Sequence, residues 1–374
     1  MRKIEKFTSV LPHAISISLI PIVWYSGLNG GWTVLLLPLL GWFFFSLGDA
    51  ILGLNTMNYD PNVPDQRLVW YHRLTLIWVP LQFLTLFGII WLVTNSNNLN
   101  TLEQICLFFG MGVITGKVGV NYAHELMHQK SHHEWRSSEF LLAMVLYSHF
   151  KSEHMLVHHP YVGTPRDTVT ARYNENFFSF FRRVVAQSPK SAFRAEKALL
   201  ERKNLPWRSR NNPFFRYGAT QAVMLILAGV LGGWSGLGLF LWQALVAIWQ
   251  LELLNYIEHY GLTRKHLGHG KYEHIGQHHS WHAARMASNW LLVNLHRFSD
   301  HYEQLNRRLP IMQNHDEASA PQLPYGNHLM TIFAMIPSLW RRNMNPRVLQ
   351  WRKMYYPEIT NWQPYNKGLN PTPR

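Results

Sequence analysis

Histidines stand in groups along this 374-residue chain, and two of the groups contain a pair of histidines four residues apart. The groups are His124-Glu-Leu-Met-His128, His154-Met-Leu-Val-His158-His159, Asn255-Tyr-Ile-Glu-His259-Tyr-Gly261 and Ser299-Asp-His301. An imidazole nitrogen is a ligand for divalent iron, zinc and copper. On a helix, side chains four residues apart lie on the same face about one turn apart, so a metal ion fits between them. The pattern predicts a metal site assembled from several segments.

The joint occurrence of these groups favours metal binding over the simpler alternatives. A single pair with this spacing also arises by chance, and a helical histidine near a membrane surface is often only an interfacial polar group. His124 follows an apolar run, where an imidazole without a ligand or partner is costly to bury. Four adjacent carboxylates either orient a ligand imidazole through its other ring nitrogen or are ordinary charged groups: Glu125, Glu153, Glu258 and Asp300.

The composition limits the ligands to imidazole and carboxylate groups. The chain has one cysteine, Cys106, so neither a disulfide framework nor a thiolate metal site can form within it. The sequence also lacks a P-loop and the glycine-rich fingerprint of dinucleotide-binding proteins. Reducing equivalents for a redox reaction would therefore have to come from another protein.

Long apolar runs alternate with polar segments, and a bilayer core requires about 20 mostly apolar residues per helix. Six segments meet or approach this length: about 11–28, 32–54, 75–95, 103–123, 217–233 and 236–256. The sequence predicts an all-α integral membrane protein with six transmembrane helices. We expect one membrane-embedded domain over residues 1–354 and an irregular, proline-containing tail over residues 355–374.

Lysine and arginine are distributed unequally between the linkers. The short linkers around residues 26–31, 95–101 and 232–238 contain none, whereas the opposite side holds the N-terminal residues, the long segment after the fourth span and the C-terminal region. By the positive-inside rule, both termini and the histidine groups lie on the cytoplasmic side of the inner membrane. This topology also explains the net charge of +14, so we do not expect nucleic acid to be a partner.

Four stretches together resemble the membrane-bound alkane monooxygenases, a family within the broader fatty acid desaturase and hydroxylase superfamily. The similarity covers about residues 55–350, and its most specific part is Asn255–Gly261, since the spaced histidines alone are common to the superfamily. The matching stretches are His124–His128, Glu153–Asp167, Asn255–Arg264 and His279–His301.

The resemblance implies a six-span protein that holds two non-haem iron ions near the cytoplasmic face. The implied reaction inserts one oxygen atom from O2 into a terminal C–H bond of an apolar hydrocarbon, with electrons from rubredoxin and rubredoxin reductase. Membrane lipid surrounds such a protein. The metal ligands that the resemblance implies are His124, His128, His154, His158, His159, His259 and His301.

The last histidine group departs from the family pattern. Family members usually read His-Ser-Asp-His-His, whereas this chain reads Phe298-Ser-Asp-His301-Tyr302. His296 lies two residues before Phe298, and two helical residues turn a side chain by about 200°, so His296 would need local unwinding to reach the same metal.

Three consequences of this departure stay open at the level of sequence. Tyr302 binds ferric iron as a phenolate, a harder oxygen ligand; or another side chain fills the vacant positions; or one iron site is weak and the activity is impaired. The candidates for the vacant positions are His296, His279, Asp300 and Glu303.

Other functions use parts of the same pattern. A fatty-acyl desaturase, or a hydroxylase of lipids or aromatic methyl groups, would have almost the same histidines. A haem protein is expected to use one or two axial histidines inside the bilayer. A metal transporter is expected to carry ionisable residues along its spans, whereas Asp49, Lys117 and Glu252 lie near the span ends.

Overall fold

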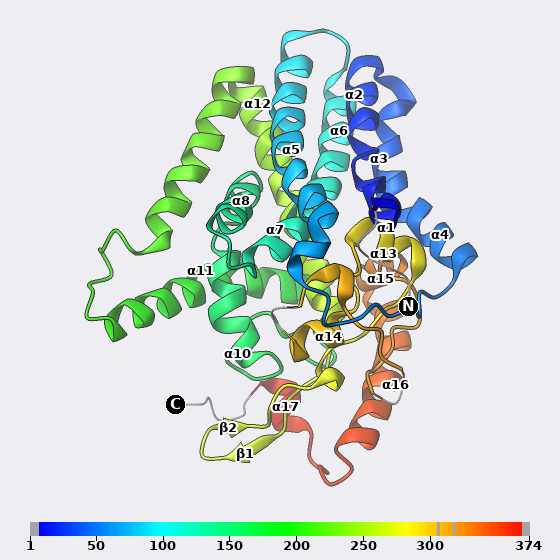
Figure 1. Cartoon of the computed structure of the whole chain (residues 1–374), viewed down its shortest axis with the longest axis vertical. Coiled ribbons are helices and arrows are strands. Elements are labelled where there is room, and N and C mark those ends of the chain that lie inside the picture. The colour runs from blue at the N-terminus through cyan, green and yellow to red at the C-terminus, as the bar shows by residue number, and fades with distance from the viewer. Residues whose placement is uncertain (1–6, 305–306, 317–318, 369–374) are drawn as a thin grey trace.

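A bundle of long apolar helices stands on a layer of shorter helices and loops (Figure 1). The computed structural model describes residues 7–304, 307–316 and 319–368. The bundle and its lower end contain α1 (Phe7–Val10), α2 (Leu19–Asn29), α3 (Leu36–Leu39), α4 (Phe45–Leu52), α5 (Val69–Asn95), α6 (Thr101–Ile114), α7 (Val120–Met127) and α12 (Pro213–His259). Around and below them lie α8 (His132–Ala143), α9 (Phe150–Glu153), α10 (His159–Tyr161), α11 (Phe177–Arg202), α13 (Met286–Leu292), α14 (Phe298–Glu303), α15 (Asn327–Ala334), α16 (Pro337–Tyr355) and α17 (Gln363–Lys367).

Five helical stretches among the described residues are long and apolar enough to cross a membrane. They are Phe7–Asn29, Gly31–Leu52, Asp65–Asn95, Thr101–Met127 and Pro213–His259. The two predicted spans at 217–233 and 236–256 fall within the single 47-residue element α12, which is interrupted at Gly233 with φ 59° and ψ −149°. A residue without Cβ adopts this conformation readily. Figure 1 shows one arm of α12 rising to this point and the other descending from it.

The outer surface of the bundle carries large apolar side chains, as expected for helices in contact with lipid. Trp32 is 71% exposed, Trp91 55% and Trp234 89%. Tryptophan is enriched where a protein crosses the membrane–water interface. These exposed side chains indicate a membrane environment around this end of the bundle.

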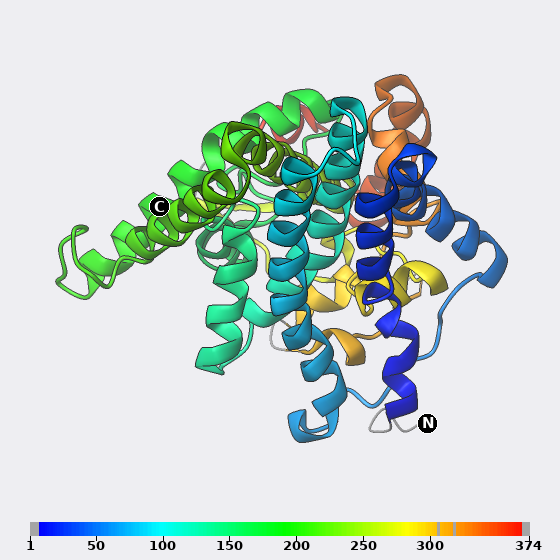
Figure 2. The ribbon, with the colours of Figure 1, turned by 90° about the horizontal axis from the view of Figure 1, so that it is seen from above.

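The short connections between the long helices meet at one end of the bundle, away from the histidine groups (Figures 1 and 2). The backbone N–H of Gly31 donates to Oε1 of Glu103 at 2.8 Å, and Nδ2 of Asn95 donates to the carbonyl of Leu231 at 3.1 Å. The three linkers without Lys or Arg therefore lie at the same end of the bundle, as the sequence predicts.

Two glycines, Gly112 of α6 and Gly116 of the π-helical turn that follows it, set the close contact with α12 that positions the site. A Cβ on Gly112 would lie 2.5 Å from Cβ of Val246, and one on Gly116 would lie 2.8 Å from the carbonyl oxygen of Ala247. Small residues four apart allow helices in membranes to approach closely. This packing places the histidines after α6 beside the end of α12 that carries His259.

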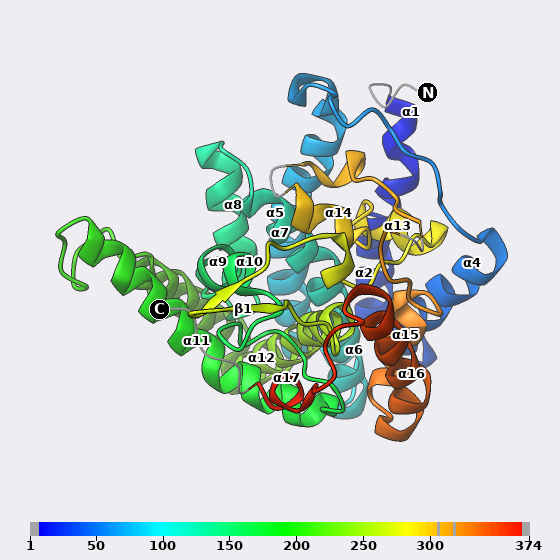
Figure 3. The same ribbon diagram turned by 90° about the horizontal axis from the view of Figure 1, so that it is seen from below.

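The C-terminal part differs from the sequence-based expectation in two respects. Strands β1 (His266–Gly268) and β2 (Lys271–Tyr272) form a two-stranded antiparallel sheet, so the fold is mostly but not entirely helical. The tail expected to be irregular contains α17, before which Trp362 covers the guanidinium of Arg352 at 4.3 Å. Figure 3 shows the hairpin, α14, α16 and α17 on the lower face.

Candidate metal centre

Five histidines from three segments converge below the bundle, and we call them the histidine cluster: His124, His128, His154, His159 and His301. Nε2 of His154 lies 2.8 Å from Nε2 of His124 and 3.2 Å from Nε2 of His128. Nε2 of His159 lies 3.3 Å from Nε2 of His128. The ligand atoms of His124, His128, His154 and His301 all lie within 4.8 Å of one another.

The local geometry of two helical segments explains how the imidazole rings are directed toward the clusters. His124 and His128 lie one turn apart at the end of α7. His154 to His158 form a π-helical turn between α9 and α10, and single π-turns inside α-helices are frequent at functional sites. His159, the first residue of α10, joins the histidine cluster, whereas His158 at the end of the turn points to a different set of side chains.

The donor atoms of the histidine cluster fit a divalent cation. Both ring nitrogens of His301, and Nδ1 of His124 and His159, are buried without a hydrogen-bond partner among the described residues. Burial lowers the pKa of His154, His159 and His301 well below the usual histidine value. The imidazoles are therefore neutral at physiological pH, which is the state that coordinates metal.

A second set of donors lies beside the first, and we call it the tyrosine cluster: His158, His259 and Tyr302. The Tyr302 hydroxyl lies 2.7 Å from Nε2 of His158 and 2.8 Å from Nε2 of His259. Burial raises the pKa of Tyr302 well above the usual tyrosine value. The phenol therefore stays protonated beside the two imidazoles unless a bound cation displaces the proton. The His154 and His158 ring centroids are 5.3 Å apart, so the two clusters are neighbours.

The imidazoles of the tyrosine cluster are oriented through their other nitrogens. Nδ1 of His158 lies 3.0 Å from Oδ2 of Asp167, and Nδ1 of His259 lies 3.4 Å from the carbonyl oxygen of His279. Burial raises the pKa of Asp167, but His158 and the hydrogen bonds from Thr170 and the backbone of Val169 together lower it below its usual value. A carboxylate or carbonyl on the far nitrogen is the usual support of a metal-binding histidine.

Asp167 is a site residue that the sequence analysis did not single out. It lies nine positions after His158, a separation that corresponds to no helical period, and the loop after α10 brings it back. We predict that Asp167→Asn lowers the metal affinity of the protein by about 10- to 100-fold, because a neutral amide is a weaker acceptor for the Nδ1 proton of His158 than the carboxylate is.

Chelator competition followed by metal analysis measures the effect of Asp167→Asn. The control is Asp60→Asn, a change at an exposed loop residue whose carboxylate caps the backbone of Asn62. Equal metal retention in the two variants would contradict the orienting role of Asp167.

The remaining expected carboxylates have varied surroundings. Glu258 has Oε2 3.7 Å from Nε2 of His259. Glu153 is fully buried, accepts from the Thr168 hydroxyl at 3.4 Å and leaves its second oxygen unpartnered among the described residues. The Asp300 carboxylate pairs with Arg307 and lies 3.2 Å from Nε2 of His315.

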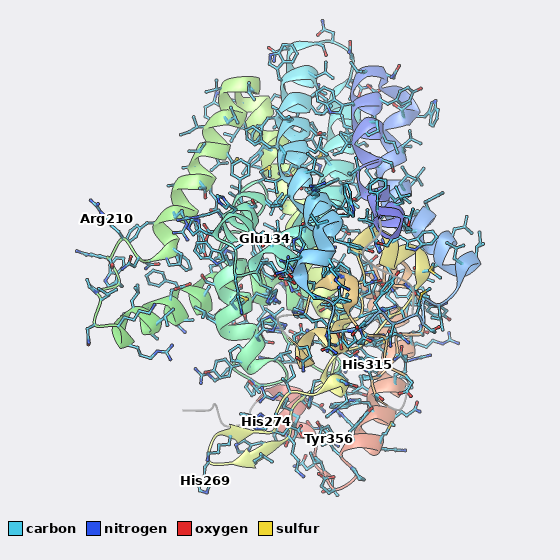
Figure 4. The ribbon with its side chains drawn as sticks, in the orientation of Figure 1. Glu134, Arg210, His269, His274, His315 and Tyr356 are labelled. Atoms are coloured by element: carbon cyan, nitrogen blue, oxygen red, sulfur yellow. The ribbon has the colours of Figure 1, made fainter. Side chains whose placement is uncertain are left out.

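Glu125 is buried and connects α7 to the C-terminal segment. Its carboxylate accepts from Arg308 at 3.4 Å and from the backbone N–H of Leu309 at 3.2 Å, and Arg308 also donates to Glu134 at 2.9 Å. Figure 4 shows Glu134 where the bundle meets the layer below. No hydrogen bond joins Glu125 to a histidine ring within the described part of the chain. The Glu125 carboxylate therefore joins α7 to the C-terminal segment through Arg308 and Leu309.

His296 and His279, which were considered for the vacant positions, have other neighbours. The His296 ring lies 5.8 Å from Phe298 and 6.2 Å from His328, in a separate pocket. The His279 ring bonds Glu273 and Tyr356 instead, at 3.2 and 2.9 Å. The Glu303 side chain lies outside what the structure describes. Of the residues considered, Tyr302 is the one that occupies the second donor set.

An apolar cavity reaches both clusters, and His124, His154, His301 and Tyr302 form part of its lining. The apolar part of the lining consists of aliphatic and aromatic side chains: Val120, Phe150, Leu251, Leu254, Leu295 and Phe298. Four polar or charged side chains also line the cavity: Lys117, Asn121, Asn255 and Glu258. Phe298, where the resemblance leads us to expect an imidazole, is thus part of the apolar wall. The arrangement suits an apolar molecule held against the donor atoms.

Comparisons with known proteins agree with this site. The fatty acid desaturase family model matches residues 101–301, which include every member of both clusters except Tyr302. Alkane 1-monooxygenase 2 of Pseudomonas aeruginosa is 35% identical over 80% of each chain. Alkane 1-monooxygenase 2 of Alcanivorax borkumensis is 31% identical over 93% of this chain and 92% of its own. The hydroxylase component of xylene/toluene monooxygenase of Pseudomonas putida is 28% identical over 65% of this chain and 64% of its own. The chain therefore belongs to the alkane monooxygenase family, within the wider fatty acid desaturase family.

Proposed function

We propose that the protein is a non-haem di-iron monooxygenase that hydroxylates a terminal C–H bond of an alkane-like apolar substrate with O2. The observation that carries this proposal is the pair of neighbouring donor clusters that open on one apolar cavity. The histidine cluster would hold one iron ion, and the tyrosine cluster the other. Bound iron supplies the oxygen activation that an unactivated C–H bond requires.

The protein's own side chains bind and position the reactants. The cavity walls would exclude water and hold the hydrocarbon by apolar contact, since Leu251 and Leu254 from α12 line the same cavity as the rings of His124 and His301. Asp167 holds the Nδ1 proton of His158, so that Nε2 of that ring is free to act as a ligand. The Tyr302 oxygen takes the place of a third imidazole in the tyrosine cluster.

The topology and the electron donor are part of the same proposal. We infer that the two arms of α12 each cross the inner membrane, which gives six spans with the clusters and both termini on the cytoplasmic side. Residues 1–6 and 369–374 lie outside the described residues. Arg210, at the tip of the α11–α12 connection in Figure 4, lies on an extended basic segment at this side. Rubredoxin with its reductase would deliver electrons there.

Hydroxylation of an aromatic methyl group is the second candidate. It is favoured by the similarity to the xylene/toluene monooxygenase component and by the aromatic walls that Phe150 and Phe298 contribute to the cavity. A desaturase reaction would use the same histidines but release an alkene.

Product analysis tests the proposed function. Membranes containing the protein, rubredoxin, its reductase and NADH are expected to convert octane to octan-1-ol, and p-xylene to 4-methylbenzyl alcohol if the second candidate holds. The label from 18O2 should appear in the alcohol, and purified protein should contain iron. An alkene as the main product, or alcohol labelled only from water, would overturn the proposal.

A further inference from the structure

A second, smaller cavity adjoins the one that reaches the metal clusters. The two cavities share four lining residues: Gly116, Lys117, Leu251 and Leu254. The rest of the second lining is mostly polar: Gln250, Leu292, His296, Asn327, His328 and Thr331. Its volume of about 30 Å³ is enough for a water-sized polar group. A small polar group at the end of a molecule in the first cavity can therefore enter the second.

Four buried side chains of this polar wall present atoms that nothing in the described chain satisfies. The side chains of Gln250, His296, Asn327 and His328 are at most 3% exposed. The unpartnered atoms are Nε2 of Gln250, Nδ1 of His296, both side-chain amide atoms of Asn327 and Nε2 of His328. A buried polar atom without a hydrogen bond destabilises the folded state. Several such atoms around one cavity indicate that a polar ligand supplies their hydrogen bonds.

The hydrogen bonds of His328 make its Nε2 atom an acceptor. Burial lowers the pKa of His328 well below the usual histidine value, so the ring is neutral and carries one N–H group. The Ser288 hydroxyl donates its one hydrogen to Asp49, so it must accept from Nδ1 of His328, which lies 2.8 Å away. The ring also stacks on Phe45 at 5.5 Å between centroids, which fixes its plane. The lone pair of Nε2 is therefore available in the cavity.

Gln250 contributes the complementary donor. Its Oε1 atom accepts from Nε1 of Trp42 at 3.2 Å, which identifies the other amide atom, Nε2, as the free donor. Lys117 lines both cavities, but its Nζ atom donates to the carbonyl of Gly41 at 2.9 Å. The polar wall thus offers an acceptor on His328, a donor on Gln250 and both kinds of atom on Asn327, without requiring a charged group.

We propose that the second cavity binds the hydroxyl group of the product, a primary alcohol, and so draws it away from the metal clusters. The inference rests on the proposed function for the origin of the alcohol. An alkane has no group that this wall recognises, whereas the new hydroxyl can pass Leu251 and Leu254, which line both cavities, while the alkyl chain stays in the first cavity.

A hydroxyl group matches the polar wall better than an ionised group does. It donates one hydrogen bond, which Nε2 of His328 can accept, and it accepts from Nε2 of Gln250. A carboxylate only accepts and would leave the His328 nitrogen unpaired, and an ammonium group only donates and would leave the Gln250 amide unpaired. Water has both kinds of group, so the test must distinguish an alcohol site from a cavity that holds water alone.

Equilibrium binding of labelled octan-1-ol and octane tests the hydroxyl site directly. Each molecule is partitioned into detergent micelles with and without the iron-loaded protein, and no electron donor is added, so that no turnover occurs. The ratio of octan-1-ol to octane in protein-free micelles is the reference. We expect the protein to bind octan-1-ol in preference to octane by about tenfold over this reference, the effect of a few hydrogen bonds in a buried site.

Two variants and one control make the test specific. Asn327→Leu removes amide atoms that have no partner among the described residues, so it should lose most of the preference for octan-1-ol while its thermal stability is kept or raised. His328→Phe removes the acceptor but keeps a ring beside Phe45, and it should lose the preference too. The control Asn211→Leu, at an exposed loop residue, should keep it.

Two results would overturn the hydroxyl site. The first is an equal ratio of octan-1-ol to octane with and without the unmodified protein, which would show that the second cavity holds water alone. The second is an unchanged preference in both cavity variants. A lower stability of Asn327→Leu with the preference intact would show that Asn327 only supports the fold, and it would count against the site.

The result is separable from the outcome of product analysis. A preference for octan-1-ol in a protein that oxygenates no hydrocarbon would support the hydroxyl site and overturn the proposed function. Conversely, formation of octan-1-ol by a protein that does not prefer it to octane would overturn the hydroxyl site alone.

Discussion

His154→Ala is expected to abolish both iron binding at the histidine cluster and hydroxylation activity. Nε2 of His154 is within 3.2 Å of the Nε2 atoms of both His124 and His128, so it joins donors from α7 to those of the π-helical turn. Loss of an imidazole that only supports a ligand costs about 10- to 100-fold in affinity, and loss of a ligand itself should cost more.

Iron counting on purified protein and octane turnover in membranes measure this effect. His133→Ala is a matched control, because His133 is exposed on α8 and its ring contacts His132 rather than either cluster. Both variants should be inserted in the membrane equally well. Full activity in His154→Ala with unchanged iron content would show that the histidine cluster is not the metal site.

Tyr302→Phe is expected to empty the tyrosine cluster while leaving the histidine cluster loaded. The substitution keeps the buried ring but removes the oxygen that lies 2.7 and 2.8 Å from His158 and His259. Two imidazoles then remain, and two nitrogen ligands alone hold iron weakly compared with a fuller donor set. Iron content should fall from about two ions to about one per chain.

The visible spectrum distinguishes a ligand role of Tyr302 from simple packing. A phenolate on ferric iron gives a ligand-to-metal charge-transfer band, which the oxidised wild-type protein should show and Tyr302→Phe should lack. Tyr302→His is the matched variant, since it returns an imidazole to this position and should retain iron without the band. Unchanged iron content and spectrum in Tyr302→Phe would remove the tyrosine from the ligand set.

Restoring both histidines of the usual family motif tests whether Phe298 and Tyr302 weaken iron binding at the site. Phe298→His together with Tyr302→His recreates the usual motif, and Phe298 lies in the cavity wall next to the clusters. A higher iron content in this double variant would show that the natural site is deficient. An equal iron content would show that Tyr302 is a sufficient substitute for imidazole.

Local patterns in the sequence were enough to predict a mostly helical, membrane-type fold and to single out the histidine groups. The length of an apolar run predicts a membrane span, because a helix in lipid satisfies all of its backbone N–H and C=O groups within the helix itself. A four-residue spacing predicts that two side chains lie on the same face of a helix, because helix geometry depends only on neighbouring residues. Both arguments need only neighbouring residues, and His124, His128, His154 and His301 do meet in one cluster.

Only the tertiary structure decided how these residues are divided between two sites. His158 and His159 are adjacent in sequence but point to different clusters, and Tyr302 meets His259 across 43 positions. The grouping of Lys117 with Asn327 in one cavity is equally non-local. These contacts depend on the close packing of α6 on α12 and on the fold of the C-terminal segment beneath them. Helical periodicity carries no information on such packing, because it describes one element at a time.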